Sequence, residues 1–537
     1  MSALTTSLPR WVQTPRSAFT YEALAARLQV AAAPASYLAW LIPLVITVIA
    51  GAMRLVNLDQ PHALTFDETY YVKDAYTMIS HGHPMEWPDD PNPAFVAGKP
   101  APLDSAEYVV HPPLGKWMIA VGMLLFGTDN GLGWRFSAAV VGTLSVLLVT
   151  LIGQRLFNSV TLGAVAGGLS AVDGHQLVLS RTSLLDIFQM FFIVAAFYAL
   201  LLDRTHGRRL LARKVAAAVD PATGAPPPGF LDHGPWMAWR PWRLVFALAL
   251  GGGLGVKWSM LSFIAVFCLL SVLWDLQARR VVGVRHWFTA GVLRDGVPAF
   301  FLVIPLTVLT YLSTWWGWFA TSGGYDRNWA AEHPGEGVGW LPAPLRSLWE
   351  YHRSAYEFHQ GLSSPHSWES GPWTWLFAGR PVLFYYEGTD AGAPGCPTGS
   401  CATVVTDLPN PILWWGATLA LLVVLLWWAG RRDWRTGAIL AGMLAGFGPW
   451  FMYSQRTMFF FYTITFEPFM VLALVFVLAL AIGGVGASVA RRRAGLIGVT
   501  AFLALVVLVS AFFWPVWTGQ TIPYEGWRLR LWMPSWG

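Results

Sequence analysis

Apolar runs of about 20 residues recur along the whole chain, and this repetition constrains the fold more than any other feature of the sequence. A helix of that length spans the hydrocarbon core of a bilayer. The composition agrees, because 55% of the 537 residues are hydrophobic and only 12% are charged, against roughly 25% charged in soluble domains. We therefore predict an all-α polytopic membrane protein with about 11 transmembrane helices, at residues 38–56, 134–153, 159–173, 181–202, 242–258, 259–275, 296–315, 408–429, 436–453, 459–482 and 495–516.

The first apolar run carries Arg54 near its far end, and no small-residue cleavage site follows it. We predict that this run is a retained membrane helix and not a signal peptide. The net charge of +5 does not indicate a nucleic-acid partner, because the basic residues lie in short clusters between apolar runs, where the positive-inside rule expects them.

The basic clusters also predict the orientation. With eleven spans, all of them fall on the side of the N-terminus: residues 10–27, 204–214, 279–294, 431–435 and 491–493. A twelfth candidate span, 113–127, would move the later clusters outside, against the lysine and arginine bias. We predict that 113–127 is an amphipathic helix that lies on the surface or enters the membrane only in part, that the N-terminus is cytoplasmic, and that the C-terminus is outside.

This topology predicts a domain plan with two large external loops. Residues 57–133 contain ten Asp or Glu against three Lys or Arg, and residues 316–407 contain nine against four. Functional residues concentrate in loops of this kind. The plan is a cytoplasmic segment 1–37, a transmembrane catalytic domain 38–516 with a flexible cytoplasmic loop at 203–241, and an external tail 517–537.

The second external loop holds two further features. Leu348, Tyr351, Ala355 and Phe358 recur at helical spacing, which predicts an amphipathic helix over 345–362 along the membrane surface. Cys396 and Cys401 are predicted to form a disulfide, and a reduced pair without a structural role is the alternative. Cys268 lies within a span, where packing is its expected role.

Two adjacent carboxylates, Asp67 and Glu68, follow the first span by about ten residues. Paired acids just outside a bilayer suggest chemistry on a lipid-carried substrate, with one carboxylate as general base and the other orienting a substrate. The alternative is structural, because Thr65 and Asp67 are good N-cap residues and Glu68 suits a first helical turn.

Cations are predicted to converge on the same membrane face. They are Lys116, Arg135, Arg181, Lys257 and Arg456. Charged groups at the membrane edge are costly unless they are paired or functional, and a lipid-linked phosphate would supply the counter-charge. The alternative for each is snorkelling or a structural ion pair, such as Arg181 with Asp186, and for Lys257 this alternative is favoured.

Several polar and aromatic residues leave their role open. His366 and Glu369 suit either a metal or a substrate, although no Asp-x-Asp pair is present. Trp373 is interleaved with them and is a candidate substrate contact, whereas most tryptophans should be interface anchors. Glu467 lies within the tenth predicted span and should face the protein interior or a cavity.

The motifs together resemble the protein O-mannosyltransferases of the GT-C glycosyltransferase class. They are the Asp67-Glu68 pair, the His-Pro-Pro-Leu-Gly-Lys segment 111–116, the Arg-Phe-Ser segment 135–137 and the Ser-Arg-x-x-x-Leu-Asp segment 180–186. Residues 366–373, followed by Arg380-Pro381, are similar to the bacterial and particularly the actinobacterial branch. Eukaryotic relatives carry a β-trefoil domain in the loop after the seventh span, and 316–407 is too short to hold it.

This resemblance implies a reaction. Mannose would pass from polyprenyl phosphate mannose, with inversion, to Ser or Thr hydroxyls of secreted polypeptides outside the cell membrane. Asp67 would be the base and Glu68 would help to bind acceptor or sugar. The donor phosphate would be held by Arg135 with Lys116, Arg181 or Arg456, and acceptor or sugar contacts are expected from His111, His366, Glu369 and Trp373.

The resemblance leaves other points open. It implies no definite cofactor, and a divalent cation that serves the phosphate is the alternative. It also implies docking to the protein secretion channel. One alternative is a transferase that uses the same donor type on a lipid or polysaccharide acceptor. The other is a flippase or transporter for a polyprenyl-linked sugar, which would be expected to show repeated halves and broken helices near the midplane.

Overall fold

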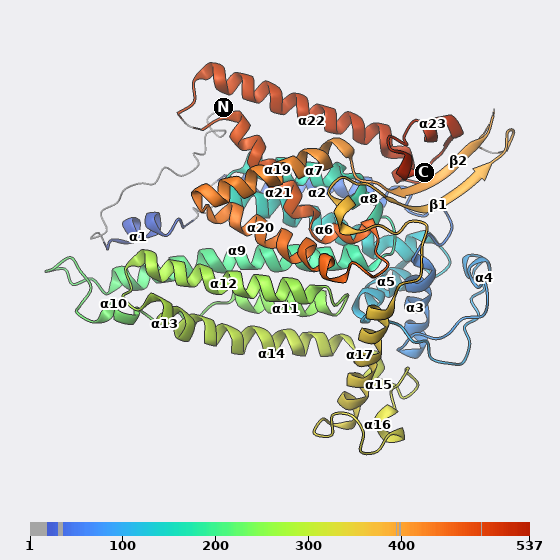
Figure 1. Ribbon diagram of the computed structural model, residues 1–537, viewed down its shortest axis with the longest axis horizontal. Helices are drawn as coiled ribbons and strands as arrows, with labels where there is room; N and C mark the ends of the chain where they lie inside the picture. The colour runs from blue at the N-terminus through green and yellow to red at the C-terminus, as the bar shows by residue number, and fades with distance from the viewer. Residues whose placement is uncertain (1–18, 31–35, 394, 397–398, 485) are drawn as a thin grey trace.

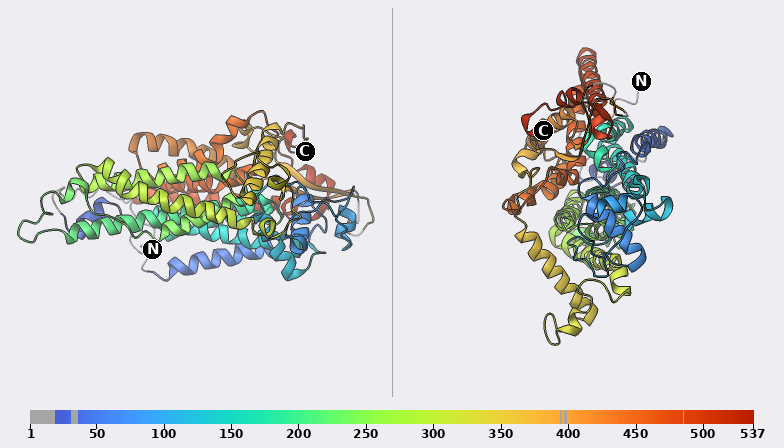
Figure 2. Two further views of the ribbon diagram at one scale, coloured as in Figure 1. Left: turned by 90° about the horizontal axis from the view of Figure 1, so that it is seen from below. Right: turned by 90° about the vertical axis from the view of Figure 1, so that its right-hand side faces the viewer.

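Long helices run side by side along one axis of the molecule (Figure 1, Figure 2). The computed structural model describes residues 19–30, 36–393, 395–396, 399–484 and 486–537. Most of the predicted N-terminal segment 1–37 lies outside these residues, and its one helix, α1 (Tyr21–Arg27), packs against α9 and α12.

Seven helical segments within the described residues are long and apolar enough to cross a membrane. They are α2 (Leu38–Leu55), α6 (Gly131–Phe157), α9 (Leu185–Ala217), α12 (Met260–Val282), the combined Trp287–Thr314 segment of α13 (Trp287–Gly291), η2 (Val292–Gly296) and α14 (Val297–Thr314), α19 (Pro411–Arg431) and α22 (Val489–Trp517).

The other four predicted spans correspond to shorter helices. They are α7 (Val160–Val172), α11 (Trp242–Leu254), α20 (Trp434–Phe447), and α21 (Glu467–Ile482), which follows the 3₁₀ helix η4 (Phe460–Thr465). Each of the eleven predicted spans thus contains a helix, and the number that cross a membrane stays a prediction.

Different helices and strands lie at the two ends of the bundle. Figure 1 places α1, α10 (Phe230–His233) and α13 at one end, and α3 (Glu68–His81), α4 (Asn92–Val96) and the sheet at the other. We call these the α1 end and the α3 end. The predicted cytoplasmic loop is shorter than expected, because α9 continues through 203 to Ala217.

The predicted surface helix 113–127 is α5 (Leu114–Phe126), which lies at the α3 end and packs against α3 and α6 (Figure 1). The second external loop forms α15 (Trp316–Ala320), α16 (Trp329–Glu332), α17 (Ala343–Gly361) and α18 (Pro372–Trp375). Leu348, Tyr351 and Ala355 of α17 are buried as predicted, whereas Phe358 is exposed, because the contact face of the helix turns away from it.

A small sheet accompanies the mostly helical fold. Strands β1 (Val382–Thr389), β2 (Cys401–Asp407) and β3 (Thr521–Pro523) pair antiparallel in that order. Cys396 and Cys401 form a disulfide where the chain enters β2. The predicted external tail therefore completes a sheet, and Trp536 in η5 (Pro534–Trp536) is buried and donates to the Ala378 carbonyl. Between β3 and η5 lies α23 (Tyr524–Arg528).

Buried polar networks hold the helices together inside the bundle. Arg54 of α2 donates to Gln176 in α8 (Gly174–Leu179), and Gln176 donates to Glu467 at the start of α21. Glu467 is fully buried, so it faces the protein interior, one of the two environments that its position in an apolar run predicted. Near the α1 end, Asp203 and Asp275 pair with two buried arginines, Arg240 and Arg243.

Candidate active site

Asp67 lies at the N-terminus of α3 with its side chain free of any capping role. It makes no side-chain capping hydrogen bond, and its Oδ2 instead accepts a long 3.4 Å hydrogen bond from the hydroxyl of Tyr71. The N-cap alternative therefore does not describe the Asp67 carboxylate. The side chain is available for chemistry.

Burial changes the acidity of this carboxyl. Loss of solvation, which is the largest cause, and nearby Asp186 together raise the pKa of Asp67 to about 6, against the opposing effects of nearby Lys257 and of the Tyr71 hydrogen bond. A carboxylate with a pKa near neutrality accepts a proton more readily than an ordinary aspartate, which suits a general base. The same neighbours show that Asp67 lies beside the α9 and α12 ends, although it is 119 positions from Asp186 in sequence.

Glu68 has a different environment from its neighbour. Its exposure is 0%, and its two oxygens accept from Thr65, from the Ser183 N–H, and from Arg135 through two bonds of 2.8 Å. No lone pair is left for a sugar or an acceptor. Glu68 therefore anchors the turn that carries Asp67, and its predicted contact with acceptor or sugar stays a prediction.

All the side-chain N–H groups of Arg135 are engaged in anchoring the same turn. Its five N–H groups donate to Glu68 and to the carbonyls of Leu58, Pro61 and Ala63, and its exposure is 1%. Each donor already has a partner within the protein, and the predicted role of Arg135 in binding the donor phosphate stays a prediction. The sequence places an arginine at the right membrane level but does not reveal that a buried partner occupies it.

Two more of the predicted phosphate ligands are also occupied. Arg181 donates to four backbone carbonyls at the end of α2 and its exit loop, those of Met53, Arg54, Val56 and Asn57. Lys116 is buried and pairs with Asp74 at 3.1 Å. Their positions at the α3 end agree with the predicted convergence, whereas their bonds are structural.

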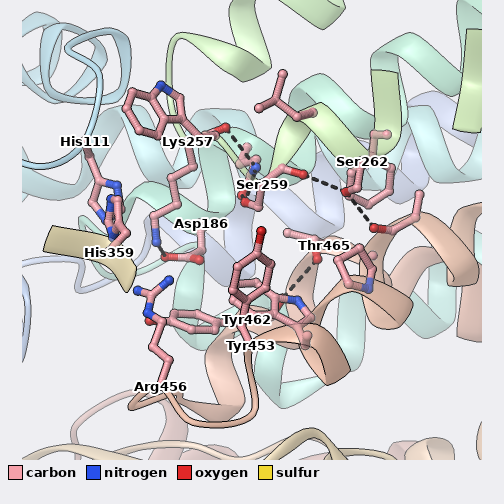
Figure 3. Close-up of a pocket in the computed structure, with 18 of the residues that line it drawn as sticks. His111, Asp186, Lys257, Ser259, Ser262, His359, Tyr453, Arg456, Tyr462 and Thr465 are labelled. Carbon is pink, nitrogen blue, oxygen red and sulfur yellow. Dashed lines mark hydrogen bonds and ion pairs between the residues drawn. The ribbon is translucent and has the colours of Figure 1, made fainter. Parts of the chain in front are cut away.

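A cavity of about 240 Å³ lies at the α3 end between α9, α12, α17 and α20. Figure 3 shows Arg456 directed towards Lys257 and Asp186, with His111 and His359 above it. Lys257 pairs with Asp186 at 2.7 Å. Within the described part of the chain, the Arg456 guanidinium has no ion-pair partner, so it is the predicted phosphate ligand that remains available.

The two histidines of the cavity are neutral. Burial, together with nearby Lys257 and other cations, holds the pKa of His111 well below its usual value. Burial and the nearby Arg456 lower the pKa of His359 to about 4. The rings lie 5.1 Å apart, and His359 Nε2 bonds the Val110 carbonyl. His111 therefore presents a neutral imidazole that can exchange hydrogen bonds with hydroxyl groups.

The other predicted contact residues lie outside the cavity. His366 packs edge-on against Phe66 and Phe459, and Glu369 is exposed and accepts from the His366 backbone. Trp373 is 70% exposed and contacts Phe451. Among the described residues no group of three or more His, Cys, Asp or Glu gathers as for a metal ion.

The sequence does not predict several of the cavity residues. It does not single out His359 or Tyr462, it indicates Asp186 only as a partner for Arg181 and as part of the 180–186 motif, and it favours a structural role for Lys257. A signal existed for Asp186 and Lys257, since each is a charged residue at the edge of an apolar run. Their mutual pairing, over 71 positions, could not be deduced from that signal.

The chain is similar to known proteins over nearly its whole length. The family described as dolichyl-phosphate-mannose-protein mannosyltransferase matches residues 44–211, and the C-terminal four-transmembrane region of protein O-mannosyltransferase matches residues 344–536. A polyprenol-phosphate-mannose–protein mannosyltransferase of Mycolicibacterium smegmatis is 37% identical over 505 residues, which cover 93% of each chain.

Other relatives agree. Proteins with the same name from Mycobacterium tuberculosis and Corynebacterium glutamicum are 36% and 32% identical, with at least 92% of each chain covered. The yeast protein O-mannosyltransferase Pmt1-Pmt2 complex, whose structure was solved with the sugar donor bound, matches with a TM-score of 0.70 at 15% identity, over 95% of this chain and 94% of the yeast chain. At that identity the likeness concerns the fold.

Proposed function

Since the chain belongs to the polyprenol-phosphate-mannose–protein mannosyltransferase family, we propose that it transfers mannose from polyprenyl phosphate mannose to Ser or Thr hydroxyls of polypeptides. The observation that carries the proposal is the cavity in which Arg456 faces the Lys257–Asp186 pair. Asp67 does not line this cavity but lies near enough to the pair to interact with both charges. A base therefore lies next to a cavity that holds cations and is open to a lipid-borne substrate.

Asp67 is the general base in this proposal. An alcohol has a pKa far above neutrality, so its attack on the anomeric carbon is faster when a carboxylate accepts its proton. The new bond joins the hydroxyl oxygen to C1 of mannose, the C1–O–phosphate bond breaks, and polyprenyl phosphate leaves. Attack from the face opposite the phosphate inverts the anomeric centre, and no protein group becomes glycosylated.

Arg456 and Lys257 stabilise the leaving phosphate. Charge develops on the phosphate oxygens as the glycosidic bond breaks, and a guanidinium can hold two of them at once. Lys257 is partly neutralised by Asp186 in the free enzyme, so a bound phosphate competes with that carboxylate for the ammonium group. His111 is placed to contact the sugar hydroxyls.

The apolar part of the cavity receives the isoprenoid. Leu261 and Phe263 of α12 and Ala445 of α20 line it, and Leu261 is largely exposed on the outside of the bundle. A polyprenyl chain can therefore stay in the membrane while its phosphate reaches Arg456. His366, Glu369 and Trp373 lie on the exposed side of the α3 end, where they are placed to contact an acceptor polypeptide.

This mechanism implies an orientation. The α3 end faces the outside of the plasma membrane, where secreted polypeptides emerge, and the α1 end, with its clustered arginines, faces the cytoplasm. Docking to the secretion channel would bring acceptors to the same face.

Asp67→Asn tests the proposal. Purified protein in detergent or proteoliposomes is given radiolabelled polyprenyl phosphomannose and a Thr-rich peptide, and transfer to the peptide is measured. Loss of the base lowers the rate by roughly 100- to 10,000-fold, while thermal unfolding stays close to that of the unmodified protein. Asp104→Asn, which changes an exposed acid in the same external loop as Asp67, is the matched control. Full turnover by Asp67→Asn would show that Asp67 is not the general base.

A further inference from the structure

Phe66, directly before Asp67, has a backbone conformation that aromatic residues rarely adopt. Its φ angle is +48°, in the left-handed region. There the Cβ atom of an L-residue crowds the following carbonyl, so such a conformation persists only when the surroundings impose it. The structure shows which contacts impose it.

A buried ion pair fixes the backbone of the turn on either side of Phe66 and Asp67. Glu68 reaches back to the Thr65 N–H and hydroxyl, which closes the turn across Phe66 and Asp67. The same carboxylate is bound by Arg135 and by the Ser183 N–H. The residues on both sides of Phe66 and Asp67 are therefore anchored to α6 and to the start of α9.

Four aromatic rings from distant parts of the chain hold the side chain of Phe66. Phe66 stacks on Phe384 of β1 at 5.1 Å and meets Phe461, Phe459 and His366 edge-on at 5.7, 5.8 and 5.9 Å. These rings come from the second external loop and from the first residues of η4 with the residue before it. We call the four of them the ring cage.

We propose that Phe66 is a positioning residue, whose ring, held in the cage, keeps the half-buried Asp67 carboxylate near the Lys257–Asp186 pair. This inference rests on the proposed role of Asp67 as base. The cage thereby couples the second external loop to the base in the first, although the loops are about 300 residues apart.

Loss of the ring has a definite chemical consequence. Without the cage the turn relaxes towards ordinary φ values, and Asp67 moves out and becomes hydrated. The groups that act on Asp67 are Asp186, Lys257 and the Tyr71 hydroxyl, and its burial is the largest influence of all. Hydration removes that influence, so the pKa of Asp67 falls from about 6 towards its usual value of 3.8. Donor binding at Arg456 is not affected.

The experiment compares Phe66→Ala with Phe66→Tyr in the full-length protein. For Phe66→Ala we expect kcat to fall by roughly 10- to 100-fold, as for a base moved out of reach, with the donor KM within about twofold. The acidic limb of kcat/KM against pH should move down from near 6 by at least one pH unit. Phe66→Tyr, which keeps a ring, should restore both.

Phe95→Ala is the matched control. Phe95 is a buried phenylalanine in the same external loop that contacts the rings of Tyr76, Trp87 and Trp134. Its loss should lower the melting temperature and leave the acidic limb in place. The inference is overturned if Phe66→Ala keeps wild-type kcat and its limb near pH 6, or if Phe95→Ala shifts the limb equally. Activity of Asp67→Asn would instead overturn the proposed function, so the two failures are distinct.

Discussion

Asp67 and Glu68 are adjacent and chemically alike, yet the structure gives their carboxylates opposite environments. Glu68 is fully buried and saturated with hydrogen bonds, which makes it a structural anion. Asp67 has one weak hydrogen bond and a raised pKa. At the residue scale, function therefore follows from which carboxylate the surrounding groups leave unpaired.

The arginines also divide into one that is paired within the fold and one that is available for substrate, and mutations can test this division. We expect Arg135→Ala to destabilise the fold by about 3–5 kcal/mol, because it leaves the buried charge of Glu68 without a partner. We expect Arg456→Ala to fold normally and to raise the donor KM by about tenfold or more, because it removes a phosphate ligand. Thermal unfolding and donor kinetics measured on both variants separate the two roles.

A double variant provides the control for this prediction. Arg135→Met combined with Glu68→Leu removes both charges and should be less destabilised than Arg135→Ala alone. A well-folded Arg135→Ala protein with a specific loss of donor use would return Arg135 to the phosphate site.

At the scale of elements, the cavity is formed where several helices end or change direction. α11 ends at Leu254 and α12 begins at Met260, and Lys257 lies in the turn between them. α20 gives way to the 3₁₀ helix η3 (Gly448–Tyr453), and Arg456 follows it. Charged side chains can be placed at the membrane edge in these turns without interrupting a helix inside the bilayer.

The isoprenoid route leads to a prediction about α12. Leu261 lines the cavity and is 56% exposed, so Leu261→Trp should narrow the route from the membrane. We expect a several-fold rise in KM for a long polyprenyl donor, as for roughly 1–2 kcal/mol of steric cost, and little change for a donor shortened to a few isoprene units. Donor kinetics with both chain lengths are the measurement.

Leu269 supplies the comparison on the same helix. It is 59% exposed but does not line the cavity, so Leu269→Trp should leave both KM values unchanged. An equal effect of the two tryptophans would contradict a route past Leu261.

At the scale of the whole molecule, the two ends of the bundle are different surfaces. The sheet lies at the α3 end (Figure 1), and the cage includes Phe384 of its strand β1. Asp203 and Asp275, with their paired arginines, belong to α9 and α12, the two helices against which α1 packs. The C-terminal segment joins the sheet, so the last residues of the chain stabilise the loop that supplies the cage.

The orientation can be tested by cysteine labelling. In a Cys268→Ser background, Ala222→Cys in the loop after α9 should react with a membrane-impermeant maleimide only after the cytoplasmic face is opened. Ala101→Cys in the first external loop should react in intact cells, because the positive-inside rule places the two loops on opposite sides. Both positions are exposed. Labelling of Ala222→Cys in intact cells would show that this loop lies outside the cell and that the proposed orientation is wrong.

The sequence by itself determined the class of this protein, the position of its apolar helices and the membrane level of its charges. These follow from local quantities, since the length of an apolar run and the charges at its ends are read along the chain. It also singled out Asp67, because an acid beside a span is unusual. The sequence did not predict the small sheet, since its strands are short and β3 lies about 115 residues from β2.

Only the tertiary structure decided which charges are free. Arg135 meets Glu68 over 67 positions, Lys257 meets Asp186 over 71, and Arg181 meets carbonyls at the end of α2. A pairing over such distances depends on how the helices pack, and desolvation makes each pairing decisive for the chemistry of the group. The cavity and the ring cage around Phe66 exist for the same reason, since each is assembled from segments that meet only in the folded bundle.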